Sequence, residues 1–157
     1  MNKYIEIIQP DDWHVHFREG DMLEMVTNFS SRINNRCVAM PNTKIPITDT
    51  NKAILYKTQI KRASKNNFEP LVPCYLNDNL DLNNFRLGLK KKIFFGSKLY
   101  PTNATTNSKY GVSEISKVFK LLEILEEENC PLLIHGEKVA EHIDIFDREK
   151  YFIDDEL

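Results

Sequence analysis

The chain has 157 residues, enough for one domain with a sizeable core, and it is 41% hydrophobic and 28% charged, with a formal net charge of −2. This balance argues against disorder and gives no reason to expect a nucleic acid or a membrane as partner, and the sequence shows neither a signal peptide nor a long apolar run. Its cysteines, Cys37, Cys74 and Cys130, form no CxxC pair, which indicates buried thiols in a reducing, cytoplasmic compartment.

Short apolar segments alternate with helical patterns along the chain. Strands are predicted at residues 4–8, 13–17, 37–40, 71–76, 93–100 and 131–134. Helices are predicted from Asp21, from Thr48, over 83–92, from Ser113 and over 143–157, with Asp21, Thr48 and Ser113 as capping residues. Repeated strand–helix units with short connections predict a parallel sheet in an α/β fold.

The first predicted helix has an apolar stripe, because its hydrophobic residues recur at helical spacing. They are Met22, Met25, Val26, Phe29 and Ile33. We also expect Trp13, in the preceding strand, to be a core residue rather than a platform for a ligand.

A pair of histidines, His14 and His16, lies in the strand predicted at 13–17. Alternate residues of a strand share a face, so the two imidazoles can bind one divalent metal ion. Arg18 follows as a fixed cation within reach of an anionic ligand. Taken alone, an ordinary strand with two polar residues is the commoner situation.

Further polar residues fall at the ends of later strands: Asn42, Lys98 and His135. Each has a simpler explanation, since Asn42 can make a turn, Lys98 can extend its ammonium to the surface, and His135 can be a core histidine. Their shared position favours a site, because the carboxyl ends of the strands converge at the mouth of a (β/α)₈ barrel. A doubly wound sheet would do the same, but the chain lacks its glycine-rich phosphate loop.

Several segments together form a more specific pattern: residues 10–16, 40–42, 98–107, 135–137 and 143–149. With them the chain resembles the dihydroorotase family of the amidohydrolase superfamily, in its short bacterial form. The resemblance implies a (β/α)₈ TIM-type barrel of which only about the first five βα units are present. Residues 1–157 would then be the N-terminal part of a single amidohydrolase barrel domain.

The resemblance also implies a site with two zinc ions. His14 and His16 would bind the first ion, and His135 would bind the second. Lys98 would react with CO₂, and the resulting carbamate would bridge both metals. Burial favours that modification, because it lowers the pKa of a lysine amine toward the neutral form that reacts with CO₂.

The substrate implied by the resemblance is a small carboxylate-bearing molecule held by Arg18 and Asn42, under a mobile loop that carries Thr105 and Thr106. The implied reaction is the reversible cyclisation of N-carbamoyl-L-aspartate to L-dihydroorotate in pyrimidine synthesis, and the family also suggests a homodimer. The sixth-strand zinc ligand and the eighth-strand aspartate of the family have no counterpart in this chain. A non-catalytic barrel fragment that at most binds metal therefore stays open as an alternative, and another cyclic-amide hydrolase is a weaker one.

Overall fold

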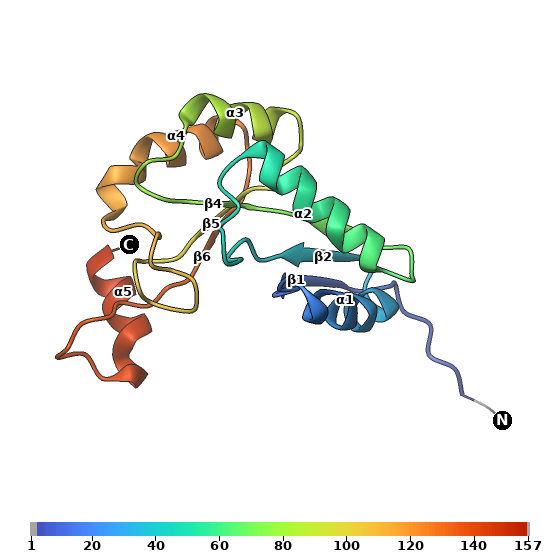
Figure 1. Ribbon diagram of the computed structural model, residues 1–157. Helices are drawn as coiled ribbons and strands as arrows, with labels where there is room; N and C mark the ends of the chain where they lie inside the picture. The colour runs from blue at the N-terminus through green and yellow to red at the C-terminus, as the bar shows by residue number, and fades with distance from the viewer. Residues whose placement is uncertain (1–2, 157) are drawn as a thin grey trace.

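The computed structural model describes residues 3–156 as an α/β fold in which all paired strands are parallel (Figure 1). One sheet contains β1 (Asp11–Val15), β2 (Arg36–Ala39) and β3 (Glu69–Leu71). The other contains β4 (Cys74–Tyr75), β5 (Ser97–Leu99) and β6 (Leu132–Ile134). The strands follow one another in chain order within each sheet, as expected for successive βα units.

Helices alternate with most of these strands along the chain and surround them (Figure 1). They are α1 (Asp21–Ile33), α2 (Thr50–Ala63), α3 (Leu82–Lys90), α4 (Phe119–Glu127) and α5 (Arg148–Glu156). Short 3₁₀ turns precede the last two, at Ile115–Val118 and Ile145–Asp147. The predicted parallel α/β fold is therefore confirmed. Within residues 3–156, no helix combines the length and the apolar character needed to cross a membrane.

The strand predicted at residues 71–76 is wrong as a single element. It is divided at Val72 and Pro73, so that β3 pairs with β2 whereas β4 pairs with β5. Proline has no N–H to donate to a neighbouring strand. It is therefore best tolerated where the chain leaves one strand partner and pairs with another. The carbonyl of Val72 still accepts a hydrogen bond from Phe95 N at 2.9 Å, which keeps the two sheets adjacent.

A single hydrophobic core lies between the strands and the helices. Its members that are almost completely excluded from solvent include Phe17, Ala39, Ile60, Val72, Cys74, Leu76, Phe85, Phe94 and Val118. Such large buried side chains stabilise the fold through the apolar area that they remove from water. Because the core holds the strands in place, the residues that follow each strand occupy fixed positions.

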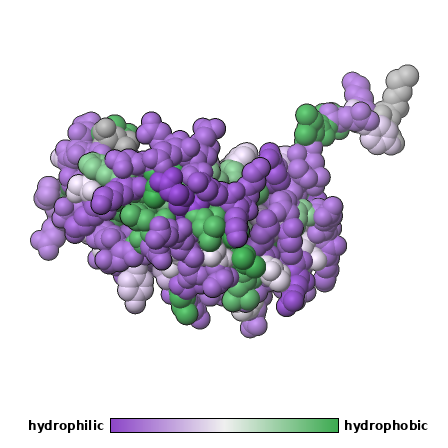
Figure 2. Space-filling model, turned by 90° about the horizontal axis from the view of Figure 1, so that it is seen from above, coloured by the Kyte–Doolittle hydropathy of each residue, from purple (hydrophilic) through white to green (hydrophobic). Residues whose placement is uncertain are grey.

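The strand predicted at residues 4–8 is also wrong. This segment projects from the body of the molecule as coil, and Ile5, Ile7 and Ile8 are 77–94% exposed (Figures 1 and 2). Its alternating pattern fits a strand, but β1 pairs only with β2 and offers it no hydrogen bonds. Trp13 is likewise not a core residue, because it is 48% exposed and contacts Phe95 at the surface.

Two predicted caps are replaced by neighbouring residues, and one has a different role. Helix α1 follows Gly20 and has no side-chain cap, so Asp21 is its first residue. Asp49, not Thr48, caps α2 by accepting a hydrogen bond from Lys52 N at 2.9 Å. Ser113 lies before the 3₁₀ turn and bonds to Asp78 instead. Cap positions depend on the local backbone path, which sequence patterns locate only within a residue or two.

Candidate functional site

The polar residues singled out above follow the carboxyl ends of four parallel strands. His16 follows β1, Asn42 follows β2, Lys98 lies in β5, and His135 follows β6. Parallel strands place these ends on one side of the sheet, where α/β proteins bind their ligands. The fold therefore brings together residues that lie up to 121 positions apart in the sequence.

The two histidines of β1 converge as their spacing predicts. The Nε2 atoms of His14 and His16 are 3.2 Å apart. Zinc binds imidazole nitrogens at about 2.0–2.1 Å with tetrahedral angles, which places two such nitrogens about 3.3 Å apart. The pair therefore fits one zinc ion without rearrangement. Burial, together with the charge of Arg18, lowers the pKa of His16 to about 4, so this ring is neutral and able to act as a ligand.

Lys98 is buried in β5 and does not extend to the surface. Its side chain is 3% exposed, and its nearest aromatic contact is the ring of Tyr100, whose centroid lies 5.3 Å from Nζ. No ion pair compensates this amine within the described part of the chain. Burial lowers the pKa of Lys98 to about 8, which makes the neutral, reactive amine accessible near neutral pH.

His135 completes the histidine set. Its backbone N–H donates to Leu99 O at 3.0 Å, which extends the β5–β6 ladder and fixes the residue beside Tyr100. The buried Nε2 has no hydrogen-bond partner among residues 3–156, and Glu137 Oε2 lies 3.3 Å away. His135 is thus not a satisfied core histidine. Both His135 and Lys98 lower the pKa of His14, an effect second to burial, which shows that the three groups share one environment.

Arg18 and Asn42 flank this cluster. Arg18 has a left-handed backbone conformation with φ 63°, and its carbonyl oxygen lies 3.4 Å from the donating hydroxyl of Tyr56. Asn42 is 3% exposed, so it is not a simple surface turn residue. Its Nδ2 donates to the carbonyl oxygen of Thr106 at 3.0 Å. A cation and an amide donor therefore lie beside the histidines, where a carboxylate could be bound.

The segment with Thr105 and Thr106 is a loop, as predicted, and it reaches the site through residues that the sequence did not single out. Asn107 Nδ2 donates to Asn42 O at 2.9 Å, and the hydroxyl of Tyr75 donates to Asn107 O at 3.1 Å. The only sequence signal for Tyr75 is its place at the end of β4, equivalent to that of the other site residues.

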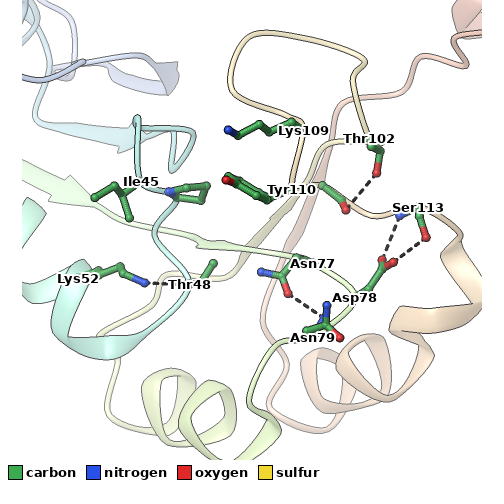
Figure 3. A pocket seen from close by; sticks show the side chains of 12 residues that line it. Ile45, Thr48, Lys52, Asn77, Asp78, Asn79, Thr102, Lys109, Tyr110 and Ser113 are labelled. Atoms are coloured by element: carbon green, nitrogen blue, oxygen red, sulfur yellow. Dashed lines mark hydrogen bonds between the residues drawn. The ribbon is translucent and has the colours of Figure 1, made fainter.

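A separate cavity of about 560 Å³ lies on the outer side of this loop. Figure 3 shows Ile45 and Lys52 on one side of it, Asn77 beside Asn79 on another, and Lys109 and Tyr110 from the loop. It contains none of the predicted site residues.

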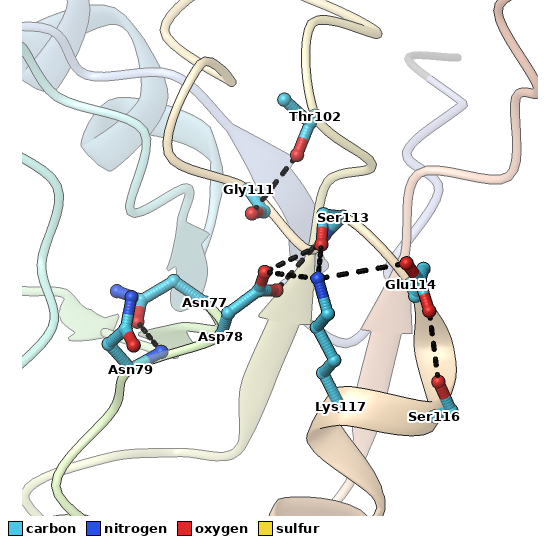
Figure 4. A network of polar contacts seen from close by, with 9 residues as sticks. All are labelled: Asn77, Asp78, Asn79, Thr102, Gly111, Ser113, Glu114, Ser116 and Lys117. Atoms are coloured by element: carbon cyan, nitrogen blue, oxygen red, sulfur yellow. Dashed lines mark hydrogen bonds and ion pairs between the residues drawn. The ribbon is translucent and has the colours of Figure 1, made fainter.

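A polar network borders that cavity and fixes the end of the loop (Figure 4). Asp78 accepts hydrogen bonds from Ser113 N at 3.0 Å and Ser113 Oγ at 2.6 Å, and Lys117 donates to Ser113 Oγ at 2.7 Å. The carboxylate thus ties the chain after the loop to the segment that follows β4.

Several known proteins that are similar to the chain are named dihydroorotase. No family model matches the chain. A dihydroorotase from Photorhabdus laumondii is 47% identical over 152 residues, which are 96% of this chain and 43% of that protein. One from Salmonella heidelberg is 44% identical over 155 residues, 98% of this chain and 44% of the relative.

Nearly the whole chain is thus homologous to part of proteins named dihydroorotase. It spans less than half the length of the curated relatives it matches.

Solved dihydroorotases have a closely similar backbone. The Saccharomyces cerevisiae enzyme, solved in complex with 5-fluoroorotic acid, matches with a TM-score of 0.86 and 30% identity over 92% of this chain and 42% of the other. The Campylobacter jejuni dihydroorotase matches with a TM-score of 0.83 and 34% identity over 93% and 42%. An L-hydantoinase from Arthrobacter aurescens, at 15% identity and a TM-score of 0.65 over 83% of this chain and 29% of the other, shares the fold alone.

The side chains of this dihydroorotase homologue provide a partial set of metal ligands. Within residues 3–156, no three His, Cys, Asp or Glu side chains are grouped to hold a metal ion. The histidine pair could supply two ligands to one ion, and a further ligand could come from a modified Lys98, from solvent or from residues beyond those described.

Proposed function

We propose that the chain forms the N-terminal part of a dihydroorotase barrel and that residues 1–157 supply its first five βα units. The enzyme would be a zinc-dependent cyclic amidohydrolase that interconverts N-carbamoyl-L-aspartate and L-dihydroorotate in cytoplasmic pyrimidine synthesis, as a homodimer. The observation that carries the proposal is the convergence of His14 and His16, with Nε2 atoms 3.2 Å apart, in the same environment as buried Lys98 and His135. Identity of 47% to a named dihydroorotase supports it.

Four residues would hold the metal centre. His14 and His16 would bind one zinc ion through their neutral rings, and His135 would bind a second through Nε2, which lies 3.3 Å from Glu137 Oε2. Lys98, as a carbamate formed with CO₂, would bridge the two. Bound zinc would supply an acidified water and polarise the amide carbonyl of the substrate. The protein contributes the neutral amine at Lys98, because burial lowers its pKa to about 8.

The remaining site residues would orient the substrate. Arg18 offers a planar guanidinium that can bind a carboxylate with two parallel hydrogen bonds, and Asn42 offers a buried amide donor beside it. Thr105 and Thr106 lie on the loop that Asn42 contacts, so this loop can cover a carboxylate held there and exclude water. These residues favour a carboxylate-bearing cyclic amide over other substrates of the superfamily.

The test is the rate at which L-dihydroorotate is opened, with zinc and bicarbonate present. It is measured for the 157-residue chain and for a chimera in which the chain replaces the matching segment of the Photorhabdus relative. The proposal requires turnover by the chimera that is lost in His14→Ala and Lys98→Ala and kept in the matched control His142→Ala, which changes an exposed histidine. A folded chimera that binds zinc but never turns over substrate would favour the non-catalytic alternative.

A further inference from the structure

The loop at residues 103–111 is fixed at both of its ends. At its base, Thr102 N donates to Val112 O and Val112 N donates to Tyr100 O, each at 3.0 Å. Beyond the base, Ser113 is bound to Asp78 (Figure 4). The base therefore belongs to the rigid part of the molecule, and movement of the loop requires displacement of its tip.

The tip has its own internal structure. Ser108 Oγ donates to Thr105 O at 2.6 Å and accepts from Thr105 N at 2.9 Å. Asn103 N donates to Ser108 O at 3.2 Å, which closes the loop on itself. Because these bonds lie within the loop, its tip keeps its shape whether or not it contacts the rest of the molecule.

Three hydrogen bonds join the tip to the rest of the described chain, and they involve only two residues of the body. The side-chain Nδ2 of Asn42 donates to Thr106 O at 3.0 Å, and the backbone carbonyl oxygen of Asn42 accepts from Asn107 Nδ2 at 2.9 Å. Tyr75 donates to Asn107 O at 3.1 Å. The position of the tip, with Thr105 and Thr106, relative to Asn42 thus depends on few contacts.

We propose that Asn42, Tyr75 and Asn107 form a latch that holds Thr105 and Thr106 over the candidate site, with Tyr75 and Asn107 as positioning residues. The substrate-related part of this proposal rests on the function proposed above. Asn42 carries two amide hydrogens, so one can remain on Thr106 O while the other binds a ligand carboxylate. Ligand binding and loop closure then stabilise each other through the same side chain.

The surroundings of Tyr75 and the backbone conformation of Asn107 suit these two residues to hold the tip. Tyr75 is fully buried and stacks on Tyr100 with ring centroids 5.2 Å apart, which fixes the direction of its hydroxyl. Burial raises the pKa of Tyr75 to about 12, so the hydroxyl is a donor at neutral pH. Asn107 has φ 57°, a left-handed conformation that asparagine tolerates and that allows its side chain to reach back to Asn42.

The latch can be tested by ¹⁵N relaxation of the 157-residue chain, read at the backbone amides of residues 105–107. Tyr75→Phe removes one hydroxyl and keeps the stacked ring, and Asn107→Asp removes the donor and keeps the backbone preference. Either change should lower the order parameters from about 0.85 to below about 0.6 at the tip only, and should lower the melting temperature by no more than about 2–4 °C, the effect of one lost hydrogen bond. Tyr110→Phe, in the same loop, is the matched control and should change neither. A tip that stays equally ordered in Tyr75→Phe and Asn107→Asp overturns the latch.

Orotate, a planar carboxylate, is the probe for the positioning role. We expect Tyr75→Phe to weaken its affinity roughly fivefold, the effect of one lost hydrogen bond, and orotate to raise the order of the tip in the wild type. Equal affinity in wild type and Tyr75→Phe, despite a loosened tip, would overturn the positioning role. A chimera with the Photorhabdus relative that carries the wild-type segment and does not bind orotate would contradict the proposed function, whereas the relaxation data would still decide the latch.

Discussion

Replacing Lys98 by methionine should stabilise the chain when zinc and bicarbonate are absent. Lys98 is 3% exposed as a residue, and the described partner of its ammonium is the ring of Tyr100. Methionine has a similar length and shape, fills the same space and carries no charge. The substitution therefore removes a buried charge without opening a cavity.

The magnitude follows from the pKa of Lys98, which burial lowers from 10.5 to about 8. Each pKa unit is worth about 1.4 kcal/mol, so the buried ammonium costs roughly 3 kcal/mol, and the lost cation–π contact offsets about 1 kcal/mol of that. The folded-state pKa lies below the unfolded-state value. The cost is therefore complete below pH 8 and disappears as the pH rises from 8 to 10.5.

The assay is urea unfolding of the wild type and of Lys98→Met at pH 7 and pH 10. The difference between the two proteins is the informative quantity, because burial raises the pKa of Cys37 to about 11 and also raises that of Cys74, so both proteins lose stability at alkaline pH. We expect the variant to be about 2 kcal/mol more stable at pH 7 and to lose most of this advantage at pH 10. Lys120→Met, at an exposed lysine of α4, should show no such change. A variant that is less stable at pH 7, or whose difference from the wild type is independent of pH, would refute the reasoning.

Three further outcomes are expected. In a zinc titration calorimetry experiment, His14→Ala should lower the affinity at least tenfold, because it removes a ligand, whereas His142→Ala should not. With ¹³C-bicarbonate at neutral pH, one carbamate resonance should depend on Lys98, since its lowered pKa gives about 300-fold more neutral amine than an ordinary lysine has; a resonance that survives in Lys98→Met would contradict this. Phe85→Ala should cost about 3–5 kcal/mol in urea unfolding, because the ring is fully buried, whereas Phe146→Ala, at a 90% exposed ring, should stay within about 0.5 kcal/mol.

The order of strands and helices could be predicted because it depends on local patterns. Apolar runs bounded by turn residues located the strands from β1 to β6, and helical spacing located the helices between them. The segment at residues 4–8 has the same alternation as a strand, but within residues 3–156 it belongs to neither sheet, and a strand exists only when another strand pairs with it. Pairing is a tertiary property, so a single segment cannot reveal it.

The site could be predicted in part for a related reason. His14, His16, Lys98 and His135 were singled out because strand ends converge in a parallel sheet, so their positions along the chain already imply proximity. Tyr75 was missed, although it also ends a strand. Its role depends on a hydrogen bond to Asn107, 32 residues away, and on the path of a loop with no regular pattern.

Helix α1 shows that the spacing of hydrophobic residues predicts an apolar face but not its burial. Its apolar stripe was recognised, yet Met22, Met25, Phe29 and Ile33 are all more than half exposed. The side of α1 that faces α2 is polar instead: Asn28 Nδ2 donates to the carbonyl oxygen of Ala63 at 3.2 Å, and Ser31 Oγ accepts from Asn66 Nδ2 at 3.1 Å. Full burial of each such apolar side chain stabilises a fold by roughly 1.5–3 kcal/mol. Within residues 3–156, contacts bury less than half of each of these four side chains, so most of this stabilisation is absent. Periodicity therefore identifies which face of a helix gains from burial, but only the three-dimensional packing decides which face is buried.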